Sequence, residues 1–349
     1  MMIPKNSIQS LKGYQVSDMK YEIQLDANES KNFLFPNGIV VNDLEINLYP
    51  DNQANVLRAE ISKYIGVDSK YIIEGNGSSE LLELLVKTYV DKNEVILSFE
   101  PSFSMYKIYS QIYSTSYIGV PSNKDFSLDI NLMIEYAKKN NPKLIFICTP
   151  NNPTGYLIPK EDIIKLLENT NALVAVDEAY MEFTNGSSSM VNEFNRYKNL
   201  VILRTMSKAF GLAGIRLGYL IANFEIINTL NKVKSPYHLN ALSQYVGIQA
   251  FQRKDLVQKN VSEVMKRRDL LEIELSKLGF VIYPSFGNFL FVYSDIKNLL
   301  ERLKRRGILI RGFSNELSSY YRITIGTKEE NEVLVNQLKE IIHENINNN

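Results

Sequence analysis

A lysine near the end of an apolar stretch has phosphate-binding residue types around it. Leu200–Leu203 has the short, β-branched apolar pattern of a buried strand, and Lys208 lies just beyond it. Lysines are rarely buried without a partner, so the ordinary interpretation of Lys208 is a side chain that reaches the surface. Thr205, Ser207 and Arg216 favour a different interpretation, because two hydroxyls and a guanidinium suit a phosphate held beside an amine nucleophile.

An amine nucleophile beside a phosphate site is what a pyridoxal-phosphate (PLP) enzyme needs, with the lysine bonded to the cofactor as a Schiff base. Asp177 follows the apolar run Leu173–Val176, where a carboxylate could keep the pyridine nitrogen protonated or could simply cap a turn. Tyr180 and Asn152 could donate to the phenolate oxygen of the cofactor. Phe103 could stack on its ring or be a core aromatic.

A glycine turn between a strand and a helix is a second candidate for phosphate binding. A short strand at Tyr71–Ile73 leads into Gly77, Ser78 and Ser79, and helical spacing of apolar residues follows over Glu80–Val90. Free N–H groups at a helix N-terminus bind anions. A serine in such a turn also caps many ordinary helices.

The elements that position these residues alternate as in an α/β protein with a mostly parallel sheet, and ligands bind such sheets at the carboxyl ends of the strands. After Pro236 the pattern changes to two helices, 239–251 and 257–278, and then to a small α+β region. We predict an N-terminal arm (1–30), a large PLP-binding domain (31–245) and a small C-terminal domain (246–349). Strands of the large domain are expected at 71–73, 95–97, 116–120, 144–147, 173–176, 200–203 and 216–222.

The composition of the chain argues against several classes of protein. The 349 residues carry 39 basic and 39 acidic side chains, which argues against nucleic-acid binding. One cysteine and two histidines predict no intrachain disulfide and no metal site. No apolar run approaches the ~18 residues of a membrane span, and the N-terminus lacks a signal-peptide core, so we expect no membrane partner and a cytoplasmic protein.

The motifs together resemble those of fold-type I (aspartate-aminotransferase-like) PLP enzymes. The resemblance rests on Asn152–Gly155, Asp177–Tyr180 and Ser207–Gly211 with Arg216, in this order. More narrowly, the chain resembles the histidinol-phosphate aminotransferase family from Tyr14 to Gly326. That likeness adds the segments Leu25–Glu29, Leu48–Pro50 and Tyr321–Gly326 together with Arg311. Ser79 departs from the family, which commonly has an acidic residue there.

The resemblance implies a homodimer that transfers an amino group between L-histidinol phosphate and 2-oxoglutarate in histidine biosynthesis. Lys208, Asp177 and Tyr180 would be the catalytic residues. The family pattern implies that Tyr49 reaches the cofactor phosphate, and Tyr14 the substrate, of the neighbouring subunit. It also implies that Asn28 binds substrate, and that Arg311 and Arg322 together bind the substrate phosphate.

Three alternatives remain open at this stage. An aromatic-amino-acid aminotransferase shares the fold, and an apolar pocket separates imidazole from phenyl only modestly. A phosphothreonine decarboxylase shares the stretch Asn151–Gly155 but matches Asp26–Glu29 poorly. A transcriptional regulator of this fold would need a helix-turn-helix domain, for which residues 1–30 are too short.

Overall fold

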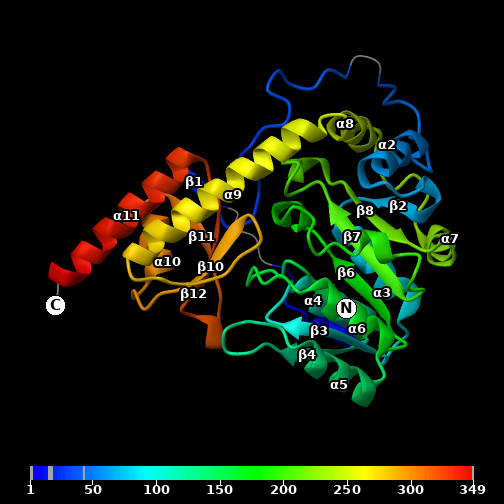
Figure 1. Ribbon diagram of the computed structural model, residues 1–349, viewed down its shortest axis with the longest axis horizontal. Helices are drawn as coiled ribbons and strands as arrows, with labels where there is room; N and C mark the ends of the chain where they lie inside the picture. The colour runs from blue at the N-terminus through cyan, green and yellow to red at the C-terminus, as the bar shows by residue number, and fades with distance from the viewer. Residues whose placement is uncertain (1–2, 15–18, 42–43, 348–349) are drawn as a thin grey trace.

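The computed structural model describes residues 3–14, 19–41 and 44–347, which form two sheets surrounded by helices (Figure 1). The seven-stranded sheet has the order β2-β8-β7-β6-β5-β3-β4, and the five-stranded sheet has the order β1-β11-β12-β10-β9. The strands are β1 (Ile23–Leu25), β2 (Ile72–Gly75), β3 (Val95–Glu100), β4 (Ser116–Pro121), β5 (Leu144–Cys148), β6 (Leu173–Asp177), β7 (Leu200–Thr205), β8 (Gly218–Ala222), β9 (Val281–Tyr283), β10 (Phe289–Tyr293), β11 (Ile308–Gly312) and β12 (Tyr320–Thr324).

Helices cover the sheets and connect them. The α-helices are α1 (Asn6–Gln9), α2 (Asn55–Ile65), α3 (Ser78–Tyr89), α4 (Met105–Tyr113), α5 (Ile130–Asn140), α6 (Lys160–Glu168), α7 (Phe224–Val233), α8 (Ala241–Phe251), α9 (Lys254–Lys277), α10 (Leu299–Arg305) and α11 (Lys328–Asn347). Short 3-10 helices are η1 (Ser69–Tyr71), η2 (Met181–Thr184), η3 (Val191–Glu193), η4 (Ala213–Ile215) and η5 (Asn315–Leu317).

The large sheet is buried on both faces. Along β5, Ile145 and Ile147 belong to one hydrophobic cluster, whereas Leu144 and Phe146 belong to another. Because successive side chains of a strand point to opposite faces, the two clusters lie on opposite sides of the sheet. Each fully buried aliphatic side chain stabilises the fold by about 1.5–3 kcal/mol. This explains why the strands could be predicted from continuous apolar runs.

The carboxyl ends of the central strands meet at one edge. Strands β3 to β7 run parallel, while β8 is antiparallel to both of its neighbours. Cys148 at the end of β5 is in register with Asp177 at the end of β6, and β7 ends at Thr205 beside them. The predicted mostly parallel sheet therefore forms, and the loops after its strands lie together.

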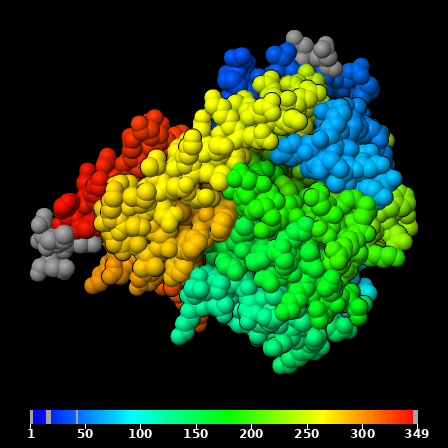
Figure 2. Space-filling view, in the orientation of Figure 1, coloured from blue at the N-terminus to red at the C-terminus, as the bar shows by residue number. Residues whose placement is uncertain are grey.

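The small sheet takes in part of the predicted N-terminal arm. Ile23 is in register with Ile308, so β1 pairs in parallel with β11. Helix α9 extends from α8, near the large sheet, to the small sheet (Figures 1 and 2). The predicted domain boundary at 245/246 lies inside α8, which packs against α2, and the boundary stays a prediction.

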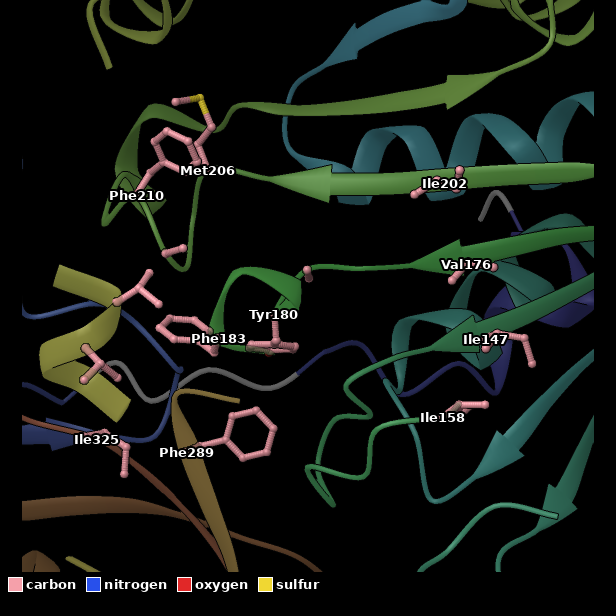
Figure 3. Close-up of a cluster of buried hydrophobic side chains, with 14 of the residues drawn as sticks. Ile147, Ile158, Val176, Tyr180, Phe183, Ile202, Met206, Phe210, Phe289 and Ile325 are labelled. Carbon is pink, nitrogen blue, oxygen red and sulfur yellow. The ribbon is translucent and has the colours of Figure 1, made fainter. Parts of the chain in front are cut away.

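The two bodies share a continuous core (Figure 3). Ile147, Val176 and Ile202 of the large sheet lie on the face that also carries Tyr180. The Tyr180 ring packs edge-on against Phe289 of β10, with ring centroids 5.1 Å apart. Tyr180 thus stands where the core of the large sheet meets that of the small one.

The sequence patterns did not predict helix α1, the three-residue strand β1, helix α7 or the short 3-10 helices. Across the described ranges, no helix combines the length and apolarity needed to cross a membrane. The same ranges contain no group of three or more His, Cys, Asp or Glu side chains placed to hold a metal ion.

Candidate active site

Lys208 lies in the loop that follows β7 and reaches the edge where the strand ends meet. Its Nζ donates a hydrogen bond to the carbonyl oxygen of Ala27 at 2.9 Å. Burial, together with the positive charges of Arg322 and Arg216, lowers the pKa of the Lys208 amine to about 7. A substantial fraction of this amine is therefore neutral at physiological pH, as a nucleophile or a general base requires.

Asp177, at the end of β6, has one carboxylate oxygen bonded and one without a partner. Its Oδ2 accepts from the Tyr106 hydroxyl at 2.9 Å, whereas the buried Oδ1 has no hydrogen-bond partner in the described part of the chain. Burial raises the pKa of Asp177 to about 6. A buried polar atom left unpaired costs about 1–3 kcal/mol, so Oδ1 is an acceptor placed for a ligand donor.

The N-terminus of α3 forms one side of an anion site. Gly77 precedes the helix with φ of 80°, and Ser78 and Ser79 begin it. A Cβ on Gly77 would lie 2.6 Å from Nη2 of Arg216, so only glycine lets that guanidinium approach the turn. Free backbone N–H groups and a cation converge here, as phosphate binding requires.

The other side of the anion site is the turn after β7. Thr205 Oγ1 donates to Ser207 Oγ at 3.0 Å and accepts from the Ser207 backbone N–H at 3.2 Å. Both residues are buried, and both line the same inner cavity as Lys208. The predicted phosphate ligands therefore come from two separate strand ends.

Arg322 connects β12 to the loop after β5. Its Nη1 donates to Asn152 Oδ1 at 2.5 Å, and its Nη2 donates to the carbonyl oxygen of Asp26. Its Nε is buried without a partner within the described residues. The guanidinium is therefore fixed in place with one donor still unsatisfied.

Asn28 lies behind Tyr180 and orients it. The Asn28 Nδ2 donates to the Tyr180 hydroxyl at 3.0 Å, and its Oδ1 accepts from Thr324 Oγ1 at 3.1 Å. Asn28 is fully buried. Since Asn28 supplies a donor, the Tyr180 hydroxyl keeps its own hydrogen for another acceptor.

Two adjoining cavities contain most of the predicted site residues. The inner cavity, of about 240 Å³, is lined by Tyr14, Ser78, Ser79, Phe103, Asn152, Asp177, Tyr180, Thr205, Ser207, Lys208, Arg216 and Arg322 among others. The outer cavity, of about 1060 Å³, shares Tyr14, Phe103, Asn152 and Arg322 and adds Arg311. Gly77, Asn28 and Tyr49 line neither cavity. Gly77 and Asn28 stand directly behind the inner wall, while the exposed Tyr49 stacks on Tyr237 with ring centroids 4.6 Å apart.

The sequence did not identify some residues of this site. Tyr106, which bonds Asp177, lies three residues after Phe103, and its N–H donates to the Phe103 carbonyl in the turn that opens α4. Cys148, the one cysteine of the chain, lines the inner cavity. The carbonyl of Ala27 and the carboxylate of Glu29 also face this cavity, and no local pattern indicates that.

The family model described as aminotransferase class I and II matches residues 22–338 of the chain. The chain belongs to the class I and II aminotransferase family. The predicted enzyme class, transfer of nitrogenous groups, and the predicted fold class are thereby confirmed.

Curated relatives and solved structures narrow the likeness. A histidinol-phosphate aminotransferase from Caldanaerobacter subterraneus subsp. tengcongensis is 40% identical over 348 residues, spanning 97% of this chain and 98% of that protein. The structure of a histidinol-phosphate aminotransferase from Clostridium acetobutylicum has a TM-score of 0.83 and 28% identity, covering 91% of this chain and 98% of that one. One from Sinorhizobium meliloti, in complex with pyridoxal-5'-phosphate, has a TM-score of 0.88 at 22% identity over 97% of each chain.

The residues present fit the predicted cofactor, PLP. The unpaired Oδ1 of Asp177 is a ready acceptor for a protonated ring nitrogen. The start of α3 with Arg216 suits the phosphate, and Lys208 supplies an amine with a lowered pKa. PLP thus requires an acceptor for its ring nitrogen, an anion site for its phosphate and a reactive amine, and one cavity provides all three.

Proposed function

We propose that this chain is a histidinol-phosphate aminotransferase that uses PLP to transfer the amino group between L-histidinol phosphate and 2-oxoglutarate, a step of histidine biosynthesis. Relatives of that name align with almost the whole chain at about 40% identity. The family match and the cavity chemistry support the cofactor.

The observation that supports the substrate assignment is the pairing of two arginines. Arg311 and Arg322 are directly opposite in the antiparallel strands β11 and β12, and both line the outer cavity. Like charges placed opposite each other in a sheet are destabilising. Burial and the charge of Arg311 both lower the pKa of Arg322. A phosphate dianion between the two guanidinium groups would offset this repulsion with charge-assisted bonds to each.

When bound, PLP draws electrons away from the substrate carbon next to the amine, which protein side chains cannot do by themselves. Asp177 Oδ1 would hold the proton on the ring nitrogen, because an ionised carboxylate favours a neighbouring cation. Lys208 Nζ would take a proton from the substrate carbon and return it elsewhere, a role that suits an amine whose pKa is about 7.

Tyr180 and Asn152 orient the reacting groups. The Tyr180 hydroxyl, fixed by Asn28, would donate its hydrogen to the phenolate oxygen of the cofactor. Asn152 is fixed by Arg322, and it can donate through its amide nitrogen to the same oxygen. Asn28 would therefore act through Tyr180, which refines its expected role in substrate binding.

The proposal includes a homodimer in the cytoplasm. Ile46 and Tyr49, which are 83% and 82% exposed, lie on the segment before α2, and Leu48 and Val56 are also exposed. An exposed apolar surface of this kind is typical of a protein–protein interface. Within a dimer, Tyr49 would reach the partner's cofactor phosphate. Tyr14, expected to reach the partner's substrate, lines both cavities of its own chain, where Arg311 lies over its ring.

Single-turnover kinetics of the first half-reaction test the substrate. We expect histidinol phosphate to react with much higher kcat/KM than histidinol or phenylalanine, because only it places a dianion between Arg311 and Arg322. Equal use of phenylalanine would favour the aromatic-amino-acid aminotransferase. Release of CO2 from O-phosphothreonine would favour the decarboxylase.

A further inference from the structure

His238, between α7 and α8, lies between two carboxylates outside the reaction cavity. Its Nδ1 is 2.8 Å from Glu80 Oε2 and its Nε2 is 3.2 Å from Glu74 Oε1, and its side chain is only 5% exposed. Hydrogen bonds and cations lower the pKa of both glutamates despite their burial, so both carboxylates are ionised and can only accept. A neutral imidazole has one N–H. Both contacts are therefore satisfied only by the imidazolium form.

Glu80 connects His238 to the cofactor-phosphate turn. The same Oε2 that meets His238 accepts the backbone N–H of Asn76 at 2.6 Å. Asn76 is followed by Gly77 and Ser78, the turn that opens α3 and faces Arg216. In the described part of the chain, Glu80 forms an ion pair with no other cation. His238 is thus the cation that, together with the Asn76 N–H, holds the orientation of the Glu80 carboxylate.

Glu74 connects His238 to the segment that carries Tyr49. Glu74 also accepts from Arg58 Nε at 2.5 Å and from Lys234 Nζ at 2.8 Å, and Lys234 donates further to the carbonyl of Asn52 at 3.1 Å. Asn52 Oδ1 in turn accepts the Tyr237 N–H at 2.7 Å. Tyr237 is the residue on which Tyr49 stacks. One hydrogen-bonded network, buried at Glu74, therefore joins the phosphate turn to the segment expected to reach the neighbouring subunit.

We propose that His238 is a positioning residue for the cofactor phosphate, and that its imidazolium form fixes the turn 75–79 through Glu80. The inference rests on the cofactor in the proposed function and does not depend on the substrate. The charged groups that face His238 are Glu74 (β2), Glu80 (α3), Lys234 (after α7) and, through Glu74, Arg58 (α2).

The pH dependence follows from the same contacts. Burial alone would lower the pKa of His238, but its hydrogen bonds to Glu74 and Glu80 raise it above the ordinary value. A group whose pKa is raised by folding stabilises the folded state fully at pH values below its unfolded-state pKa. This stabilisation is lost as the pH rises through the raised, folded-state pKa. Retention of the cofactor should weaken over that upper range.

Loss of PLP from the intact holoenzyme tests the proposal without any substrate. The visible absorbance of the bound cofactor is followed after dilution into a phosphatase that destroys free PLP. At pH 6, His238→Gln should lose cofactor about 10-fold faster than the unaltered chain, the effect of one charge-assisted hydrogen bond. The ratio of the two rates should fall toward one as the pH rises, because the unaltered chain then loses its own imidazolium.

His343→Gln, at the other histidine, is the matched control and should leave the rate and its pH profile unchanged. The ³¹P resonance of the bound phosphate should shift in His238→Gln and not in the control. A rate ratio that is one at pH 6, or that stays constant with pH, would overturn the proposal.

Glu80→Gln keeps the test decisive if His238→Gln does not fold. The amide oxygen can still accept from Asn76, but the charge that favours the imidazolium is gone. The pH at which cofactor loss accelerates should then move downward compared with the unaltered chain. An unmoved profile would equally overturn the proposal.

Discussion

Replacing Asp177 by Asn should slow turnover severely while making the apoprotein more stable. An ionised carboxylate about 4 Å from a ring cation contributes about 4 kcal/mol at the effective dielectric of a protein. Asparagine has nearly the same shape but no charge, and it can still accept from Tyr106. At saturating cofactor we expect kcat to fall by about 10² to 10³-fold.

The stability effect of Asp177→Asn has the opposite sign. Burial raises the pKa of Asp177 to about 6. Ionising this buried carboxyl lowers the free energy of unfolding of the apoprotein, an effect that is absent at low pH and grows as the pH rises toward 7. At pH 7 this penalty is about 3 kcal/mol, since each tenfold change in proton affinity corresponds to about 1.4 kcal/mol. The apoprotein of the variant should therefore be more stable at pH 7 and nearly unchanged at pH 4.

Urea unfolding of both apoproteins at the two pH values, together with steady-state kinetics, measures both effects. Asparagine caps a turn as well as aspartate does. If Asp177 were only a cap, turnover would stay the same, and the assigned role would be refuted.

Other changes test the remaining parts of the site. Lys208→Ala should abolish both turnover and the visible absorbance of the lysine-bound cofactor, and a variant that kept either would contradict the assignment. The rate at which the apoprotein captures PLP should rise with pH through about 7 and then level off, because only the neutral Lys208 amine attacks the cofactor. Stopped-flow absorbance measures this rate, and a flat pH profile would argue against the lowered pKa of Lys208. Asn28→Ala and Tyr180→Phe should reduce kcat similarly, by roughly 10-fold, and the double variant should lose little more, because Asn28 acts through Tyr180. Additive losses would show that Asn28 acts independently.

The large sheet and much of its site could be predicted because the signals are local. Its buried strands are short apolar runs, and Lys208 and Asp177 follow two of them at the edge where parallel strands end. The resemblance in motif order then assigned residue types to roles that spacing alone leaves open. Helix α7 was missed although it is amphipathic and begins at an N-cap, Asn223, whose side chain accepts from the Ile226 N–H.

The parts that escaped depend on contacts between distant residues. Strand β1 has three residues and exists because Ile23–Leu25 pairs with β11, and no periodicity shows in so short a segment. The resemblance implied that Arg311 and Arg322 act together, but only the register of β11 and β12 shows that they lie directly opposite each other. Substrate binding by Asn28 stays a prediction, and no local pattern indicates that its side chain bonds Tyr180 and Thr324.

The substrate assignment is tested most directly by Arg311→Ala, with histidinol phosphate and histidinol compared as donors in the first half-reaction. Loss of one charge-assisted contact to a dianion should lower kcat/KM for histidinol phosphate by roughly 30 to 1,000-fold. Histidinol has no phosphate and should react almost as before. Arg322→Ala should impair both half-reactions, because the carboxylates of 2-oxoglutarate can use the same guanidinium. Equal losses with the phosphorylated and unphosphorylated donors in Arg311→Ala would contradict the phosphate site between the paired arginines.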